Sequence, residues 1–388
     1  MCLPVLIKSR QSKRKSLFEG IVLYRKERTM KKILAILLSL ALVFAFVACG
    51  GSNEEPAPAD EGEAAEEPAE TTVEPVNVVM YSPNTGNYAE KALIKMSEVM
   101  EEESGGLLKP VLIDAGTAGY QDEAVQGMMS GDMNLIVNTV DQLENYVPNV
   151  GNWMSWPFLF NSDEEASEVW DKGGWMFQRV QEQAAEKGGI HVFIYIYNGW
   201  KNLCFKGDVN GFDAWQGLKC RVPATDLFHD LCARYGLQTV SGIDPYTSLQ
   251  NGTVDSIYFS EEAFQTFKLE EVMKSCVITH DTYGSNLYTC SEAFWQSLAP
   301  EQQEALQKIV CEIGDEYNNM SRESAEGEYM DSLPGLGINV YQIDDATKTA
   351  MKKATISFWE EKLADEAYDE DFRNTFREVF EKNYADVL

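Results

Sequence analysis

Apolar and polar positions follow two alternating patterns along the chain from residue 76 onward. Residues 76–81 form an apolar run typical of a strand, whereas 89–103 carry apolar side chains at helical spacing. The same patterns predict a helix at 121–130 and further strands at 107–115, 133–138 and 191–197. Strands that alternate with helices predict an α/β fold with a mostly parallel sheet covered by helices.

The pattern starts again near Lys201 and indicates a second unit of the same kind. A long helix is expected from Pro300, because proline is favoured in the first helical turn and the apolar positions that follow lie on one stripe. The other expected elements are helices at 225–235 and 246–250, two C-terminal helices, strands at 203–206, 218–222, 254–259 and 338–341, and a strand pair spanning 276–290. The 388 residues are enough for two or three domains.

The N-terminus has the composition of an export signal. Two lysines precede residues 33–48, which are apolar apart from one serine, and this run is short for a membrane span but fits a signal peptide. It ends in Phe-Val-Ala-Cys-Gly, which resembles a bacterial lipobox with Cys49 as the lipidated residue. We therefore expect residues 1–29 to be a mis-called N-terminal extension and 30–48 to be a lipoprotein signal peptide.

Residues 49–75 are expected to form a lipidated, acidic and disordered tether. Between positions 50 and 75 there are nine Asp or Glu, no Lys or Arg, and four prolines, a composition that cannot bury a core. A cysteine that carries more than one acyl chain anchors stably to a bilayer. The expected location is the outer face of the cytoplasmic membrane, at the cell surface or in the periplasm.

The charge of the chain argues against nucleic acid as a partner. The formal charge is −30, and removing residues 1–48, with ten Lys or Arg and two Asp or Glu, leaves 22 basic and 60 acidic residues, or −38. Such a chain repels phosphate backbones, and it repels small anions at long range. An anionic ligand would therefore need a local cationic clamp.

The cysteines form no metal or redox motif. Six remain after Cys2 and Cys49, and no pair has Cys-x-x-Cys spacing. An even number in an oxidising compartment permits disulfides, although a chain of this size does not need them. We expect mostly buried free thiols, and the best candidate for a disulfide is Cys276 with Cys290, which flank a predicted strand–turn–strand.

Sequence patterns of common enzymes are missing. The three histidines have no partner at metal-ligand spacing, and there is no phosphate loop, dinucleotide fingerprint, nucleophile elbow or zincin motif. Carboxylates are too frequent for a glycosidase-type pair to be identified. The chain therefore looks more like a binding protein without a cofactor than an enzyme, and an extracellular lipid-anchored hydrolase is the alternative from another class.

The segment 217–223, Gly-Leu-Lys-Cys-Arg-Val-Pro, contains the first candidate for the clamp. It reads as a short strand that presents Arg221 just before a proline-initiated loop. A guanidinium is always charged, and its planar fork matches a carboxylate through two hydrogen bonds. Taken alone, an arginine is more often a surface or ion-paired residue, so the role of Arg221 depends on the rest of the chain.

Several blocks in a fixed order resemble one family of transport proteins. They are Gln-Gly and Ser-Gly-Asp-Met within 126–133, Trp-Pro-Phe-Leu-Phe at 156–160 followed by Asp-Glu-Glu at 163–165, Asn-Gly at 198–199, the 217–223 segment, and Leu-Gln-Asn-Gly-Thr-Val-Asp at 249–255. Together they are similar to the solute-binding subunit of tripartite ATP-independent periplasmic (TRAP) transporters, the dicarboxylate-binding (DctP-like) family. The resemblance extends from residue 76 to the C-terminus.

The resemblance implies a two-lobe fold like that of periplasmic binding proteins, with crossing strands, a long spanning helix and a central ligand cleft. Lobe I would comprise 76–198 plus 286–326, and lobe II 199–285 plus 327–388. The lobes would close by a hinge motion on an organic acid held by Arg221. The closed monomer would deliver the acid to the small and large membrane subunits of a TRAP permease.

The chain departs from the family pattern at the expected ligand contacts. A second arginine often follows the Asn-Gly block, but Trp200 and Lys201 follow it here, so Lys201 is a candidate for a weaker, monodentate charge. Phe259 stands where many members have a polar asparagine, and Tyr258 precedes it. The candidate contacts in lobe I are Tyr81, Asn138 and Thr139. For the aromatic residues, core packing is the alternative role.

These departures predict a smaller or more apolar acid than a sugar acid such as sialic acid, for example a monocarboxylate with a hydrophobic tail. An ABC-type solute receptor shares the two-lobe arrangement and is the alternative among binding proteins. A sensor that passes the ligand signal to a membrane protein is another. The 156–160 block and the arginine strand favour the TRAP kind.

Overall fold

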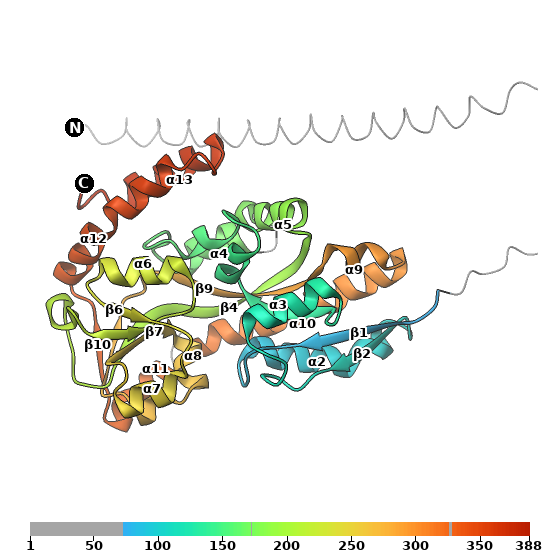
Figure 1. Ribbon diagram of the computed structural model, residues 1–388, viewed down its shortest axis with the longest axis horizontal. Helices are drawn as coiled ribbons and strands as arrows, with labels where there is room; N and C mark the ends of the chain where they lie inside the picture. Colours follow the sequence, from blue (N-terminus) through green and yellow to red (C-terminus); the bar gives the residue numbers. More distant parts are fainter. Residues whose placement is uncertain (1–72, 172, 326–327) are drawn as a thin grey trace, which may run out of the picture. The chain divides into compact units, whose positions relative to one another are not determined.

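One long strand, β4 (Ile190–Phe205), runs through the middle of the fold and is shared by the two halves of its sheet (Figure 1). The computed structural model describes residues 73–171, 173–325 and 328–388. The expected N-terminal extension, the signal peptide, Cys49 and nearly all of the tether lie outside the described residues. Of the helices within those ranges, none combines the length and the apolar content that a membrane span requires.

The first half of the sheet contains the N-terminal strands. β1 (Val76–Tyr81) pairs in parallel with β2 (Leu108–Leu112) and β3 (Leu135–Thr139), and β9 (Tyr283–Ser291) pairs antiparallel with β3 and β4. The strand order is β2-β1-β3-β9-β4. The helices of this half are α2 (Tyr88–Glu103), α3 (Gln121–Ser130), α4 (Asp163–Trp170), α5 (Trp175–Gly188), α9 (Glu292–Ser297) and α10 (Pro300–Ala325).

The second half of the sheet is built on the C-terminal part of β4. This part pairs antiparallel with β7 (Ser256–Ser260) on one side and β8 (Ser275–Ile278) on the other. β5 (Lys219–Arg221) is parallel to β7 and β6 (Gln238–Val240), and β10 (Asn339–Gln342) is parallel to β8. The helices are α6 (Asp226–Arg234), α7 (Pro245–Asn251), α8 (Glu261–Thr266), α11 (Glu328–Ser332), α12 (Asp345–Ala364) and α13 (Glu370–Asn383).

The sheet is mixed: every pairing of β4 and β9 is antiparallel, so the expectation of a mostly parallel sheet is met only by the pairings among the other described strands. The strands expected at 191–197 and 203–206 are one continuous strand, and β9 runs antiparallel to both of its neighbours. Asn-Gly at 198–199 suggested the end of a strand, because turns and bulges use the same residue types. The helices α4 and α5 were not predicted.

A bulge at Asn198 and Gly199 marks the place where β4 changes partners. The β4–β9 register shifts between Tyr197 and Gly199, and Lys201 is already paired with β7. Gly199 has a φ of 90°, a left-handed conformation that would strain a residue with a side chain. A Cβ at Gly284, on the facing strand, would lie 2.6 Å from the carbonyl oxygen of Gly199. Both glycines therefore permit the close approach of β4 and β9 at this point.

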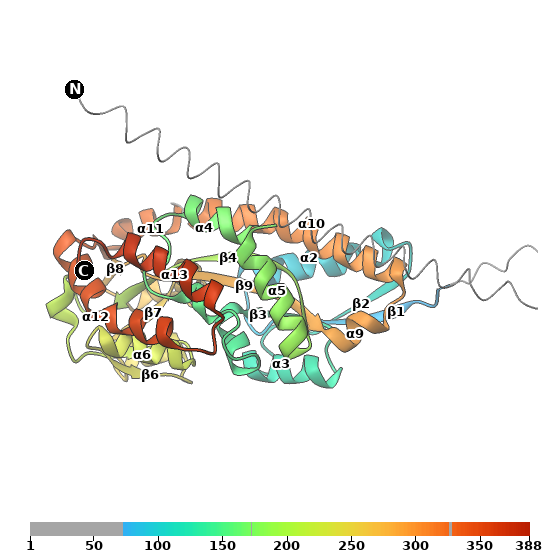
Figure 2. The ribbon, with the colours of Figure 1, turned by 90° about the horizontal axis from the view of Figure 1, so that it is seen from above.

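Helices cover both faces of the first half of the sheet. α2 and α10 lie on one face, and α3 and α5 lie on the other (Figure 2). On the first face, Val78, Met96, Ile194 and Val310 belong to one buried apolar cluster that joins β1, α2, β4 and α10. α10 is 26 residues long and also contacts α11 of the second half. It is therefore the long helix expected from the apolar stripe after Pro300, and it contacts both halves, as the family resemblance implies for the spanning helix.

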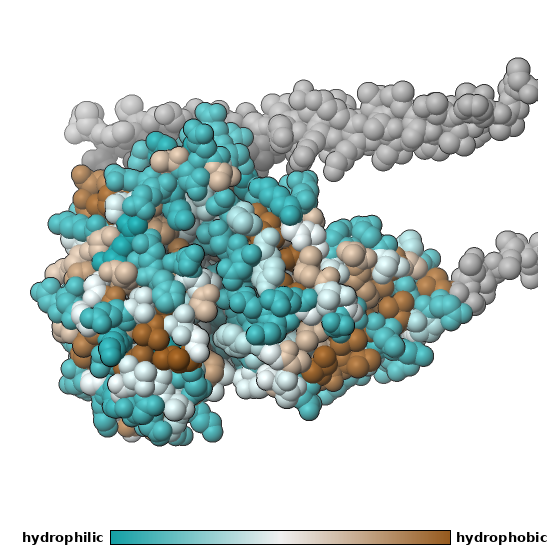
Figure 3. Space-filling model, in the orientation of Figure 1, coloured by the Kyte–Doolittle hydropathy of each residue, from teal (hydrophilic) through white to brown (hydrophobic). Residues whose placement is uncertain are grey.

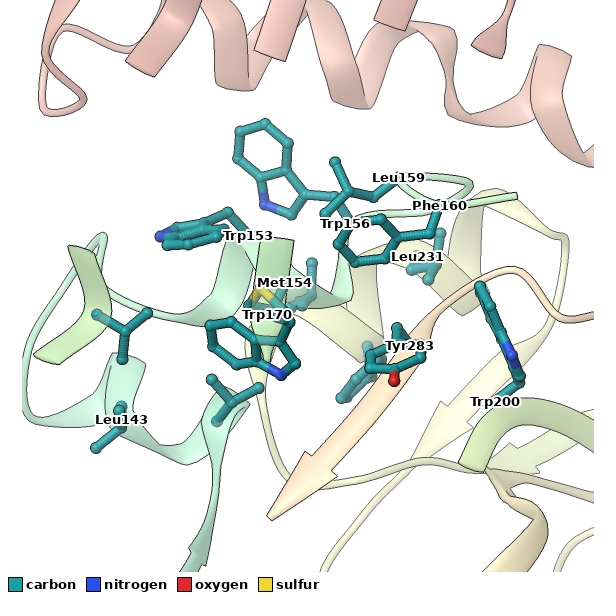
Figure 4. Packing of buried hydrophobic residues seen from close by; sticks show 14 of the residues in the cluster. Leu143, Trp153, Met154, Trp156, Leu159, Phe160, Trp170, Trp200, Leu231 and Tyr283 are labelled. Carbon is teal, nitrogen blue, oxygen red and sulfur yellow. The ribbon is translucent and has the colours of Figure 1, made fainter. Parts of the chain in front are cut away.

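A large aromatic core lies beneath the C-terminal helices. The loop that follows η2 (Asn152–Ser155) contributes Trp156, and α12 and α13 contribute Trp359, Phe372 and Phe376. The Trp156 ring meets these three rings edge-on, at centroid distances of 5.1, 6.0 and 5.2 Å respectively. Figure 4 shows it on the side of the loop that faces the pale red C-terminal helices. Because the same cluster includes side chains of β5 and α6, one core joins both halves of the sheet.

The six cysteines from Cys204 onward are buried thiols outside any disulfide, as expected, and the suggested disulfide between Cys276 and Cys290 is wrong. β8 and β9 pair with different parts of β4 rather than with each other. Cys276 lies opposite Cys204, whereas Cys290 lies opposite His191, near the other end of β4. The strand–turn–strand on which the expected pairing depended is not formed.

Candidate functional site

Two adjoining cavities lie where the two halves of the sheet meet. An inner cavity of about 70 Å³ extends to Lys201, and an outer cavity of about 580 Å³ extends to Arg221. Figure 3 shows a notch here, between the part that carries α2 and α3 and the part that carries α7 and α8. The two cavities share five wall residues, Asn84, Tyr120, Ala224, Thr266 and Phe267. Together they form a cleft between the two halves.

The loops that line the cleft follow the carboxyl ends of parallel strands. Asn84 and Asn87 come after β1, and Pro223 and Ala224 come after β5. Asn87 also caps α2, because its side chain accepts a hydrogen bond from Glu90 N at 2.8 Å. In open α/β sheets the crevice outside these strand ends is the usual place for a ligand.

Lys201 is buried, with 5% of its surface exposed, and lines the inner cavity. Its Nζ lies 4.6 Å from the centroid of the Phe228 ring. Among the described residues the ammonium has no hydrogen-bond acceptor and no ion-pair partner. Burial lowers the pKa of Lys201, and the carboxylates of Asp141 and Asp281 act in the opposite direction. A buried ammonium without an acceptor is costly, so an anionic ligand group would be strongly favoured there.

Arg221 lines the outer cavity and is also 5% exposed. Its Cζ lies 4.2 Å from the centroid of the Phe259 ring, and its Nε donates to the carbonyl oxygen of Ile243 at 3.4 Å. Nη1 is buried without a partner. Burial lowers the pKa of Arg221, and Tyr120 across the cleft opposes this shift. Phe259 therefore packs against the guanidinium while some of its donors remain unused.

Amide side chains from three adjacent strands lie beside the inner cavity. Asn198 on β4 and Asn286 on β9 line it, and Asn138 on β3 is buried nearby. Both polar atoms of the Asn286 side chain, Oδ1 of Asn198 and Nδ2 of Asn138 have no hydrogen-bond partner. Thr139 lines the same cavity and its Oγ1 donates to Gln121 Oε1 at 3.2 Å. Buried amides are rarely left unpaired, so this wall is suited to polar ligand atoms.

Two carboxylates also line the inner cavity. Asp141, in η1 (Val140–Asn145), is 4% exposed, and among the described residues its side chain has no hydrogen bond or ion pair. Glu262, in α8, accepts a hydrogen bond at 2.7 Å from the backbone N–H of Tyr88, in the first turn of α2. Burial raises the pKa of Glu262 to about 7, although the Tyr88 N–H and Lys91 act in the opposite direction. This hydrogen bond connects the two walls of the cleft.

Both tyrosines that were predicted to contact the ligand lie in the protein interior. Tyr258 is fully buried, and its hydroxyl bonds to Asp281 Oδ2 at 2.9 Å and to Thr282 Oγ1 at 2.8 Å. The Tyr81 hydroxyl donates to the carbonyl oxygen of Gly119. Neither tyrosine lines the inner or the outer cavity. Both hydroxyls are already satisfied within the protein.

Trp200 lies next to Lys201 on β4 but lines a different cavity, together with His280. Its indole N–H donates to Asp163 Oδ1 at 3.2 Å, and its ring stacks on His280 at a centroid distance of 5.5 Å. Successive side chains of a strand point to opposite faces, which explains the separation from Lys201. Of the predicted contacts, the structure brings together Lys201, Arg221, Phe259 and Thr139, with Asn138 beside them.

Sequence reasoning missed Asp141, Glu262 and Asn286. Asp141 carries a weak signal, since it follows a predicted strand whose carboxyl end faces the cleft. Asn286 carries none, because it lies within a mixed stretch that the sequence did not assign to the sheet centre.

In the described ranges no group of three or more His, Cys, Asp or Glu is arranged to hold a metal ion. The groups in the cleft offer charge and hydrogen bonds for binding.

Comparisons with known proteins agree with this architecture. The model of the bacterial extracellular solute-binding protein family 7, DctP, matches residues 79–366. The sialic acid-binding periplasmic protein SiaP of Vibrio cholerae is 23% identical over 247 residues, 63% of this chain and 76% of that protein. The 2,3-diketo-L-gulonate-binding periplasmic protein YiaO of Escherichia coli is 24% identical over 263 residues, 67% and 78% of the two chains.

A solved structure has the same fold. It is a TRAP periplasmic solute-binding protein from Haemophilus influenzae with bound L-gulonate, which matches with a TM-score of 0.70 at 21% identity and covers 78% of this chain and 99% of that one. The likeness confirms the expected two-lobe α/β fold, and the family match spans most of the described residues. The chain therefore belongs to the DctP family of extracellular solute-binding proteins, the solute-binding subunits of TRAP transporters.

Proposed function

We propose that the protein captures an organic acid in the cleft and delivers it to the membrane subunits of a TRAP transporter. Lys201 carries this proposal, because it is a buried ammonium that lines the inner cavity without an acceptor. The relatives named for sialic acid and 2,3-diketo-L-gulonate are named for carboxylate ligands, which supports an acid as the solute. The lipid at Cys49 would hold the protein at the outer face of the membrane.

The carboxylate clamp in this proposal consists of two cations rather than of Arg221 alone. Lys201 approaches the ligand from the inner cavity, and Arg221, stacked on Phe259, approaches from the outer cavity. A positive charge lowers the pKa of a cation near it, and Arg221 acts in this way on Lys201. A carboxylate between them would relieve this repulsion. Thr139 and Asn138 would add hydrogen bonds from lobe I.

Closure of lobe I (76–198 plus 286–326) on lobe II (199–285 plus 327–388) would bend the chain at Gly199, where β4 changes partners. Two contacts across the cleft support a closed arrangement: Tyr88 N–H donates to Glu262, and Tyr120 interacts with Arg221. Such contacts stabilise only the closed form, so a ligand that also bridges the lobes shifts the population toward it.

The test is a thermal-shift screen of the full-length protein against organic acids, followed by calorimetry on the hits. A ligand at a hundred times its Kd stabilises the folded state by about 2.7 kcal/mol. Lys201→Met should weaken binding of a hit by about 2 to 5 kcal/mol, because the carboxylate loses its buried partner. Lys219→Met, which removes an exposed lysine two residues from Arg221, should leave the affinity unchanged. Full affinity in both Lys201→Met and Arg221→Met, or no shift with any carboxylate, would overturn the proposal.

A further inference from the structure

The inner cavity contains a second buried charge that a simple carboxylate ligand does not explain. Asp141 is 4% exposed and Lys201 is 5% exposed, and both line this cavity. Within the described part of the chain, neither side chain forms a hydrogen bond or an ion pair. A buried ion without a partner is costly. A carboxylate would pair with Lys201, but it would leave Asp141 unpaired and bring a second negative charge close to it.

The two ions share one cavity without neutralising each other directly. Asp141 acts on Lys201 through space, yet no ion pair with an N–O distance of 4.0 Å or less joins them. The cavity has a volume of about 70 Å³. One water needs at least ~10 to 15 Å³ of such space, so the cavity has room for several non-hydrogen atoms. The head of an α-amino acid, with its nitrogen, Cα and carboxylate, has about five such atoms and carries one charge of each sign.

We infer that the solute, on the premise of the proposed function, is a zwitterionic α-amino acid, with its carboxylate between Lys201 and Arg221 and its ammonium on Asp141. The unpaired amides of the same wall complement this head group. An ammonium has three N–H donors, and Oδ1 of Asn198 and Oδ1 of Asn286 are buried acceptors without a partner. Nδ2 of Asn286 is an unpaired donor that suits a carboxylate oxygen.

The side chain of the amino acid would extend into the outer cavity. That cavity has a volume of about 580 Å³, and its wall includes an apolar set beside charged side chains; the apolar residues are Pro83, Ala224, Ile243, Pro245 and Phe267, and the charged ones are Asp122, Glu123, Arg221 and Asp244. Apolar surface of this kind accepts a branched or aromatic side chain. The solute would thus be an amino acid with an apolar side chain, in agreement with the hydrophobic tail expected from the sequence.

The first measurement compares three ligands that differ only in the group on Cα. Leucine carries an ammonium there, 2-hydroxy-4-methylpentanoate a hydroxyl, and 4-methylpentanoate a hydrogen. Matched sets with a methyl and a benzyl side chain, built on alanine and phenylalanine, cover shorter and longer solutes. In calorimetry on the full-length protein, the amino acid of at least one set should bind at least about tenfold more tightly than its hydroxy and plain acids, because a charged hydrogen bond is worth ~1.5 to 3 kcal/mol.

The second measurement uses Asp141→Asn, which keeps the shape and one acceptor but removes the charge. Binding of the amino acid should weaken by about tenfold to a hundredfold, while binding of the plain acid should stay the same or become tighter, because repulsion by Asp141 is gone. A structural defect would weaken both ligands alike, and the melting temperature of the unliganded variant measures it separately. Asp213→Asn makes the same charge change at an exposed residue of η3 (Phe212–Trp215), and both affinities should remain as in the wild type.

The outcomes separate this inference from the proposed function. If plain, hydroxylated or sugar acids bind through Lys201 while amino acids bind no better, or if Asp141→Asn weakens all acids equally, the amino acid is excluded and the organic-acid receptor stands. If no acid of any class binds, the proposed function itself fails. The result that supports a zwitterion is an Asp141→Asn variant that binds the amino acid more weakly and the plain acid equally well or more tightly.

Discussion

The aromatic core beneath the C-terminal helices and the cleft are both buried, but they are built from opposite kinds of side chain. In the core, Trp156 is fully buried among aromatic rings that meet it edge-on. In the cleft, Lys201 and Asp141 are almost as deeply buried, yet neither ion has a hydrogen bond or an ion pair among the described residues. The core therefore stabilises the fold, whereas we expect the cleft to lower its stability until a ligand pairs the ions.

Polar groups without a hydrogen-bond partner occur in both regions, but they are neutral in the core and charged in the cleft. The indole N–H of Trp156 has no hydrogen-bond partner, but it is a neutral group within a large apolar ring. An unpaired buried hydrogen-bonding group costs about 1 to 3 kcal/mol, and an unpaired ion costs more. We infer that unpaired ions persist in the cleft because binding a charged solute requires them there.

The largest effect is expected from a substitution in the aromatic core. Trp156→Ala should lower the free energy of unfolding by about 3 to 5 kcal/mol, because it removes the ring that α12 and α13 pack against. Urea titrations of the wild type and the variant measure this difference. Trp156→Phe should lose less, since a ring remains. Any ligand affinity measured on the folded variant should be unchanged, and a comparable loss of affinity would show that the core and the cleft are coupled.

A pH-dependent effect is expected from Glu262 in the wall of the cleft. Its pKa of about 7 lies above the ordinary value of 4.5, so between these values the folded protein holds a proton that the unfolded chain releases. The stability that this group contributes is fully present below pH 4.5 and is lost as the pH rises through 7, with a slope of at most about 1.4 kcal/mol per pH unit.

Glu262→Gln isolates this contribution, because glutamine does not titrate but still offers an acceptor to Tyr88 N–H. Relative to the wild type, the variant should become more stable as the pH rises from 5 to 8, as measured by urea titration at both values. The many other carboxylates titrate equally in both proteins and cancel. A difference that does not change with pH would mean that water screens Glu262 in the cleft.

The sequence predicted most of the fold because the spacing of apolar residues is a local property. Helix α3 begins and ends where the pattern places it, and α10 follows the stripe after Pro300. The mixed sheet was not predictable in this way, since the direction of β9 depends on which distant strand it meets. The Asn-Gly pair at 198–199 was misread for a related reason, because only the neighbouring β9 shows that it is a bulge within one strand.

The cleft was predictable only where a motif marks it. Arg221 stands in a block that resembles the family pattern, Lys201 lies two residues after the Asn-Gly block at 198–199, and both line the cleft. Asp141 and Asn286 lie far from these blocks in the sequence and join them because the strand order places β3, β9 and β4 side by side. The distinction between Tyr258, whose hydroxyl is satisfied in the interior, and Phe259, which faces the cavity, likewise depends on the register of β7.

The smallest effect is a gain in stability, which is expected when the cleft loses its buried ammonium. Lys201→Met replaces the buried ammonium with an apolar chain of similar length and should raise the free energy of unfolding of the unliganded protein by about 1 kcal/mol. The cost of an unpaired buried ion is larger than this, but the contact of Nζ with the Phe228 ring offsets part of it, at about 0.5 to 2 kcal/mol. Urea titration without ligand measures the change, and Lys219→Met is the exposed control. A clear loss of stability in Lys201→Met would mean that the lysine already has a partner in the unliganded protein, and the contrast between the core and the cleft would then disappear.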